Sequence, residues 1–193
     1  SVSFGQVIDL FGNYVDQDGK SLNKTGHHIN THDYFMQGGQ ITLDKQRDQE
    51  YARLLSNRIV EEFHKFNEVL PSHIVAFVAY VQLRNQFSDL DLYSFLRLPE
   101  DELVLDFATF KKNTKRLRKV ILKMAEAGQI LAGPDFDEKA EKMIEIGLNN
   151  VGMYHSKRPL ERDESGNIIT QDLRLLYFYH NRLVGYDFED YVR

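Results

Sequence analysis

The chain has 193 residues, of which 42 % are hydrophobic and 27 % charged, a composition typical of a folded globular protein. It contains no Cys, which excludes disulfides, a thiol nucleophile and a Cys-ligated metal. Its formal net charge of −5 argues against a general nucleic-acid binder, because such proteins are normally basic.

Residues 1–43 hold six glycines and show little helical periodicity. They begin with the alternating segment Ser1–Leu10, which predicts a single β-strand. A lone strand leaves its backbone donors and acceptors without partners. We therefore expect the chain to be a piece of a longer protein, with the neighbouring strands in the missing part. Turn signals at Asp16–Gly19 and at Gly38-Gly39 predict two small hairpins or loops.

From Asp44, a plausible N-cap, the pattern becomes helical. Apolar residues recur every three or four positions: Tyr51, Leu54, Leu55, Ile59, Phe63 and Phe66. Pro71 suits the first turn of a second helix, and His73 is expected to be partly buried there. The run that follows is apolar nearly all round, which fits a buried strand or a buried helix, and its two alanines favour the helix. Its most apolar part, Ile74 to Val81, has eight residues, whereas a spanning helix needs about 20, so any membrane contact is expected to be peripheral.

Ser88 is predicted to cap a short third helix over residues 89–97. The clearest helix runs from Phe107 to Met124, with Gly128 as its stop. Its apolar positions step by three or four: Phe107, Phe110, Thr114, Leu117, Ile121 and Met124. Its other face carries seven basic residues: Lys111, Lys112, Lys115, Arg116, Arg118, Lys119 and Lys123.

This basic face has two interpretations. It is either a solvated helix surface balanced by acidic residues elsewhere, or a surface that attracts anionic lipid headgroups or a phosphorylated ligand. On the second interpretation, the candidate anion-binding residues are Lys111, Lys112, Lys115, Arg118 and Lys119.

The rest of the chain continues the mainly helical pattern. Residues 137–153 have helical spacing, 159–172 predict a hairpin that turns at Ser165–Asn167, and 173–183 predict a last helix. Three aromatic residues of that helix are expected in the core: Tyr177, Phe178 and Tyr179.

Three segments resemble a known family. Residues 1–13, SVSFGQVIDLFGN, resemble the end of the acyltransferase domain of bacterial glycerol-3-phosphate acyltransferases and their acylglycerol-phosphate relatives, where a late strand reads apolar-x-Phe-Gly-x-apolar. Residues 44–130, which include RDQEYARLLSNRIVEEFHKFNEVLPSHIVAFVAYVQLRNQ, are similar to the helical region that follows this domain in the longer members. The late segment LYFYHNRLVGY is similar to an aromatic helix near their C-terminus.

The resemblance implies a mainly α chain in two parts: residues 1–43 end an α/β acyltransferase domain, and residues 44–193 form a helical C-terminal domain. The parent enzyme would transfer a fatty acyl group from acyl-CoA or acyl carrier protein to glycerol 3-phosphate or its monoacyl form. The implied partner is the missing N-terminal catalytic domain. No cofactor or metal is implied, and the expected location is the cytoplasm, peripheral on the inner face of the cell membrane.

The family's catalytic His, which is separated from an Asp by four intervening residues, and its Pro-Glu-Gly block both precede the Phe-Gly strand, so both are expected upstream of this chain. His28 and Asp33 have the required spacing, but they follow that strand in a glycine-rich loop, and we interpret them as loop residues. The neighbouring His27 and His32 make a loose cluster without the spacing of a metal site. We therefore assign no catalytic residue and no metal ligand, and the isolated chain is not expected to catalyse.

A non-enzymatic module is the alternative. Three predicted helices, 71–86, 89–97 and 105–127, followed by an extended piece, have the order of a winged-helix interaction or nucleic-acid-binding domain. The sequence shows no basic arm or wing beside them, so nucleic acid is the less favoured partner.

Overall fold

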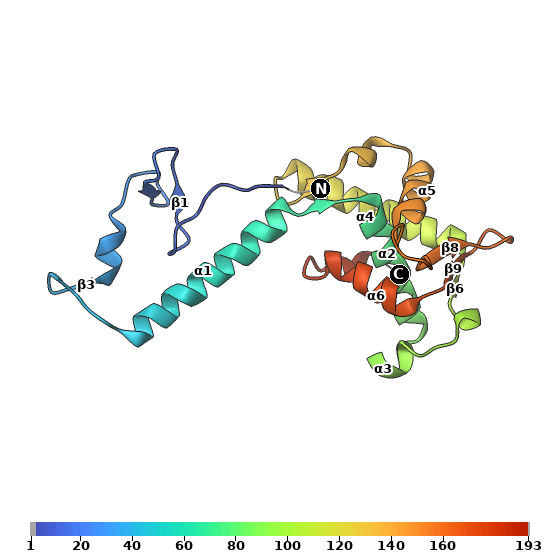
Figure 1. Ribbon diagram of the computed structural model, residues 1–193. Helices are drawn as coiled ribbons and strands as arrows, with labels where there is room; N and C mark the ends of the chain where they lie inside the picture. Colours follow the sequence, from blue (N-terminus) through green and yellow to red (C-terminus); the bar gives the residue numbers. More distant parts are fainter. Residues whose placement is uncertain (1–2, 193) are drawn as a thin grey trace. The chain divides into compact units, whose positions relative to one another are not determined.

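A computed structural model describes residues 3–192 of the chain, which is mainly α-helical (Figure 1). The helices are α1 (Lys45–Phe66), α2 (Pro71–Gln86), α3 (Leu92–Phe95), α4 (Phe107–Glu126), α5 (Ala140–Asn150) and α6 (Leu173–His180). The strands are β1 (Tyr14–Val15), β2 (Ser21–Leu22), β3 (Met36–Gln37), β4 (Gln40–Ile41), β5 (Glu68–Val69), β6 (Val104–Leu105), β7 (Leu131–Ala132), β8 (Leu160–Arg162) and β9 (Ile168–Thr170). The chain forms two compact units, an N-terminal unit that ends at Asn67 and a C-terminal unit that begins at Glu68.

In the N-terminal unit, both predicted hairpins are confirmed. Strands β1 and β2 pair antiparallel around the turn at Asp16–Gly19, and β3 and β4 pair around Gly38-Gly39. Helix α1 is confirmed as well, and the Asp44 carboxylate caps it by accepting hydrogen bonds from the amides of Gln46 and Arg47.

The predicted strand over residues 1–10 is wrong for its described part. Residues 3–7 belong to no strand, and Ile8 forms only an isolated antiparallel bridge with Tyr14. Ser1 and Val2 lie outside the described residues. The physical reason is that β1 is two residues long, so the backbone of the first segment finds few hydrogen-bond partners there. The side chains of Phe4 and Leu10 are 88 % and 78 % exposed.

Helix α1 belongs with the N-terminal segment, so the two units divide at 67/68 rather than at the expected 43/44. The Tyr14 hydroxyl donates to Glu62 (2.8 Å), and the Tyr51 hydroxyl donates to the carbonyl of Tyr34 (3.2 Å). The Phe11 ring stacks on Tyr34 with ring centroids 4.3 Å apart. These contacts tie the helix to the hairpins, yet no apolar side chain described within residues 3–67 is buried.

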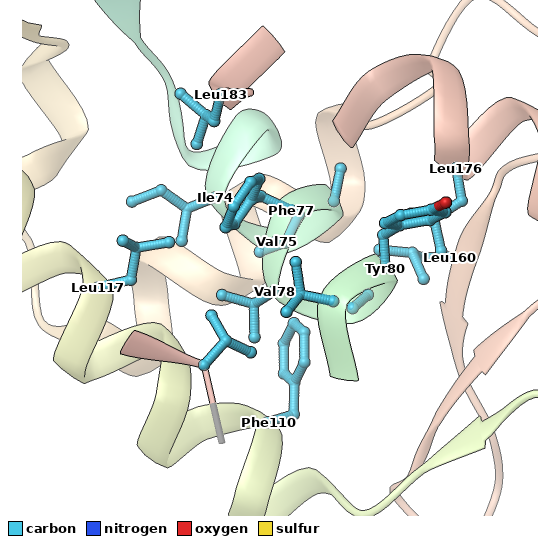
Figure 2. Packing of buried hydrophobic residues seen from close by; sticks show 14 of the residues in the cluster. Ile74, Val75, Phe77, Val78, Tyr80, Phe110, Leu117, Leu160, Leu176 and Leu183 are labelled. Carbon is cyan, nitrogen blue, oxygen red and sulfur yellow. The ribbon is translucent and has the colours of Figure 1, made fainter. Parts of the chain in front are cut away.

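The C-terminal unit is built around α2, whose residues Ile74–Leu83 are buried. Helices α4, α5 and α6 pack against it, and Figure 2 shows Phe110 and Leu117 of α4 and Leu176 of α6 turned toward it. The choice of a buried helix over a buried strand is therefore confirmed.

A small sheet completes the C-terminal unit. The predicted hairpin is β8 and β9, which pair antiparallel across the turn near Gly166. Strand β9 also pairs with β6, which gives the order β6-β9-β8. Strands β5 and β7 pair in parallel elsewhere in the unit.

Two local predictions need correction, and one is confirmed in detail. The third helix starts at Leu92 and is capped by Asp91, not Ser88, because the Asp91 carboxylate accepts from two amides of the first turn. Phe178 is 66 % exposed and not part of the core, since it lies on the outer side of α6. Gly128 does end α4: its φ is 69°, and its amide donates to the carbonyl of Ala125, as a Schellman motif requires.

Candidate anion-binding surface

Helix α4 is amphipathic: one of its faces is buried in the core and the other faces water. The Asp106 carboxylate caps it by accepting from the amide and hydroxyl of Thr109. The predicted apolar stripe is buried against α2 and its neighbours: Phe110, Thr114, Leu117 and Ile121. This burial fixes the rotation of the helix and thereby decides which basic side chains reach water.

The outer face of α4 carries five exposed basic residues, which we call the basic stripe: Lys112, Lys115, Arg116, Lys119 and Lys123. At 3.6 residues per turn they fall within roughly 100° of the helix circumference and extend over roughly 16 Å of its length. Three of the predicted candidates, Lys112, Lys115 and Lys119, therefore share one solvent-facing surface.

The other two candidates are engaged within the protein. The Lys111 ammonium forms an ion pair with Glu141 on α5, and the carboxyl pKa of Glu141 is lowered mainly by that contact. Arg118 donates to the carbonyl of Phe136 through Nε (3.0 Å) and through Nη2. Arg118 therefore holds the turn between β7 and α5, a structural task that the sequence pattern did not indicate.

The first half of α4 meets α5 and β8 along one hollowed surface. Three adjoining depressions share residues: Phe107 lines two of them, Lys115 two and Glu145 two. The charged residues of this α4–α5 surface are Lys111, Lys112, Lys115, Lys139, Lys142, Arg158, Arg162, Glu141, Glu145 and Glu161. Seven basic and three acidic side chains give +4, on a chain whose net charge is −5.

Sequence reasoning missed four of these cations: Lys139, Lys142, Arg158 and Arg162. The adjacent Lys157 and Arg158, just before the predicted hairpin, were a visible signal. These residues reach the surface of α4 only because β8 packs beside the start of that helix. Sequence periodicity carries no information about such a long-range contact.

His28 and Asp33, which have the sequence spacing of the family's catalytic pair, do not contact each other. His28 Nε2 lies 2.7 Å from Asp16, and Asp33 instead accepts from Asn30. The pKa of Asp16 is lowered, first by a backbone hydrogen bond from Lys20 and also by His28. His28 and Asp33 are exposed, and no group of three or more His, Asp or Glu residues within 3–192 is placed to hold a metal.

Two histidines of the C-terminal unit, His73 and His180, are fixed in place by packing and hydrogen bonding within the protein. His73 Nδ1 accepts the amide hydrogen of Leu70 (3.1 Å) at the start of α2, and burial lowers its pKa to about 4. His180 is 7 % exposed, its ring centroid is 4.0 Å from that of Tyr80, and burial lowers its pKa too. Both are neutral near pH 7. The expectation that His73 is a partly buried residue at a helix start is confirmed.

Comparison with known protein families, curated proteins and solved structures finds no match for this chain. Among residues 3–192, no helix is both long and apolar enough to cross a bilayer.

Proposed function

We propose that the chain is the C-terminal part of a phospholipid-synthesis acyltransferase and that its basic stripe seats the enzyme on an anionic membrane surface. The parent enzyme would transfer a fatty acyl group from acyl-CoA or acyl carrier protein to glycerol 3-phosphate or its monoacyl form. The observation that carries the seating role is the basic stripe itself, five exposed cations on one side of one helix.

The stripe has the geometry for a flat anionic partner. Its residues lie on one side of a single helix, and those of its first half continue into the positively charged α4–α5 surface. A basic residue close to an anionic membrane contributes about 1 kcal/mol of binding free energy. Three lysines should thus contribute about 3 kcal/mol, which corresponds to roughly 150-fold in affinity.

The N-terminal unit supports the proposed partner, the catalytic domain of the same enzyme. Helix α1 exposes Ile59, Val60 and Phe63, and the Phe63 side chain is 71 % exposed. Together with Phe4 and Leu10, these form apolar surface on a unit that buries no apolar side chain among its described residues. Removing such surface from water is favourable, and a neighbouring domain would do so.

The test is vesicle co-sedimentation with anionic and with neutral phospholipids. We expect binding to anionic vesicles that weakens as salt is raised. Replacing Lys112, Lys115 and Lys119 with Gln should lower the affinity by roughly 150-fold.

The matched control replaces Lys20, Lys24 and Lys45 with Gln, three exposed lysines outside α4. It makes the same change in net charge, so it should leave most of the affinity in place. Equal losses in the two variants, or no binding by the parent chain, would contradict the seating role.

One observation favours a second function, a winged-helix-like protein-interaction module. The strands and α-helices of the C-terminal unit follow the order β5, α2, α3, β6, α4, β7, α5, β8, β9, α6, and the sheet order β6-β9-β8 pairs the β8–β9 hairpin with the strand that precedes α4. Duplex DNA is disfavoured as the partner, because the turn of the β8–β9 hairpin, which would be the wing, carries the acidic residues Asp163 and Glu164. A gel shift with generic duplex DNA at low salt tests this, and we expect no shift.

A further inference from the structure

A pocket of about 290 Å³ opens where the start of α4, the outer side of α5 and β8 meet. Its apolar lining comes from Phe107, Ile144, Leu148 and Leu160. Ile144 and Leu160 are buried, whereas Phe107 and Leu148 are only partly covered, so the pocket presents apolar surface to the solvent. The pocket lies beside the basic stripe but contains none of its residues.

Two arginines line the same pocket, and they differ in whether other residues of the protein already bind their guanidinium groups. The Arg162 guanidinium lies 3.8 Å from the centroid of the Phe107 ring and donates through Nε to the carbonyl of Gly166 (3.1 Å). Arg158 is exposed and forms no hydrogen bond or ion pair with any residue in 3–192. Its five N–H donors are therefore available to an anion that enters the pocket.

The acidic residues of the lining restrict the ligand. Glu161 accepts a hydrogen bond from the side-chain amide of Gln171 (2.5 Å), which occupies one of its carboxylate oxygens. Glu145 lines the pocket and forms no hydrogen bond or ion pair with any residue in 3–192, so it favours a ligand that also carries a hydroxyl donor. An anionic group, a hydroxyl and an apolar chain are thus the three features that the lining selects.

We propose that this pocket binds one monoacyl glycerol phosphate, with the phosphate at Arg158, the free hydroxyl at Glu145 and the first part of the acyl chain against Phe107 and Leu148. The volume is at the lower end for small-molecule sites, which suits a headgroup and part of one chain but not a two-chain lipid. The choice of a glycerol phosphate rests on the proposed function, whereas the site is distinct from the basic stripe.

The experiment is isothermal titration of the full chain with a short-chain monoacyl glycerol phosphate below its micelle concentration. Inorganic phosphate tests the anion without the chain, and the neutral monoacylglycerol of the same length tests the chain without the anion. We expect the complete amphiphile to bind at least about tenfold more tightly than either part. Equal affinity for inorganic phosphate or for the neutral lipid would overturn the proposal.

Two variants separate this site from the basic stripe. Arg158→Gln, at an exposed position, should leave the fold intact and lower amphiphile affinity about tenfold or more. Lys119→Gln should leave amphiphile binding unchanged while it weakens vesicle binding. If Arg158→Gln has no effect, the pocket assignment fails even where vesicle binding holds. If vesicle binding ignores the stripe lysines while the amphiphile still binds, only the seating role fails.

Discussion

The free energy of unfolding should depend on pH because His73 binds a proton more weakly in the folded protein than in the unfolded chain. Burial, aided by the positive charge of Arg182, lowers the pKa of His73 to about 4 in the folded protein, against an ordinary value of 6.5. Because the folded pKa is lowered, the unfolded chain binds the proton first as the pH falls. The stabilisation is therefore fully present above about pH 6.5 and is lost progressively down to about pH 4. A difference of about 2.5 pKa units corresponds to about 3 kcal/mol.

The assay is urea unfolding of the full chain by circular dichroism at several pH values between 4 and 7.5. Carboxylates such as Asp91, whose pKa is lowered by hydrogen bonds from Ser94, also contribute at the acid end. The comparison must therefore be with His73→Asn, which retains an acceptor for the amide of Leu70 but does not titrate in this range. Between pH 7 and pH 4 the parent chain should lose about 3 kcal/mol more than the variant. Parallel pH profiles for the two proteins would refute the assignment.

Three further predictions concern packing. Gly147→Ala should destabilise the C-terminal unit by about 1–2 kcal/mol in chemical denaturation, despite the better helix propensity of Ala, because the new Cβ would lie 2.7 Å from the carbonyl oxygen of Pro71. Arg118→Met should lower the unfolding free energy by about 1–2 kcal/mol, since the carbonyl of Phe136 loses its donors, and should leave vesicle affinity nearly unchanged. Limited proteolysis, followed by mass spectrometry, should cut within residues 3–67 before the C-terminal unit, because no apolar side chain described there is buried.

The helices of the C-terminal unit were predictable because local chemistry specifies them. In α4, one apolar residue in every three or four meets the core, and Gly128 supplies the positive φ that ends the helix. In α2, the leading Pro71 and the two alanines decided correctly between helix and strand. The hairpin of β8 and β9 followed from a turn sequence, which is also local.

The remaining features depend on contacts between distant segments. Ser1–Leu10 alternates like a strand, but alternation provides no neighbour to accept its hydrogen bonds, and residues 3–7 remain outside any strand. Arg118 looks like one more cation of the basic face, but the carbonyl of Phe136 lies within its reach only after the chain has turned through β7. Arg158 joins the pocket at Phe107 for the same reason, since β8 brings it there.

The distribution of charge explains why net charge alone is a poor guide to this protein. The α4–α5 surface and the three further residues of the basic stripe, Arg116, Lys119 and Lys123, together carry +7, whereas the whole chain carries −5, so all other residues together carry −12. An anionic membrane would attract this one surface and repel the remainder. The acidic residues of the C-terminal unit outside this surface then contribute to its orientation, because they raise the free energy of an approach in which the basic stripe faces away from the lipid. Neutralising exposed acidic residues of the C-terminal unit outside α4 and α5 should accordingly increase total vesicle binding and reduce its dependence on Lys112, Lys115 and Lys119.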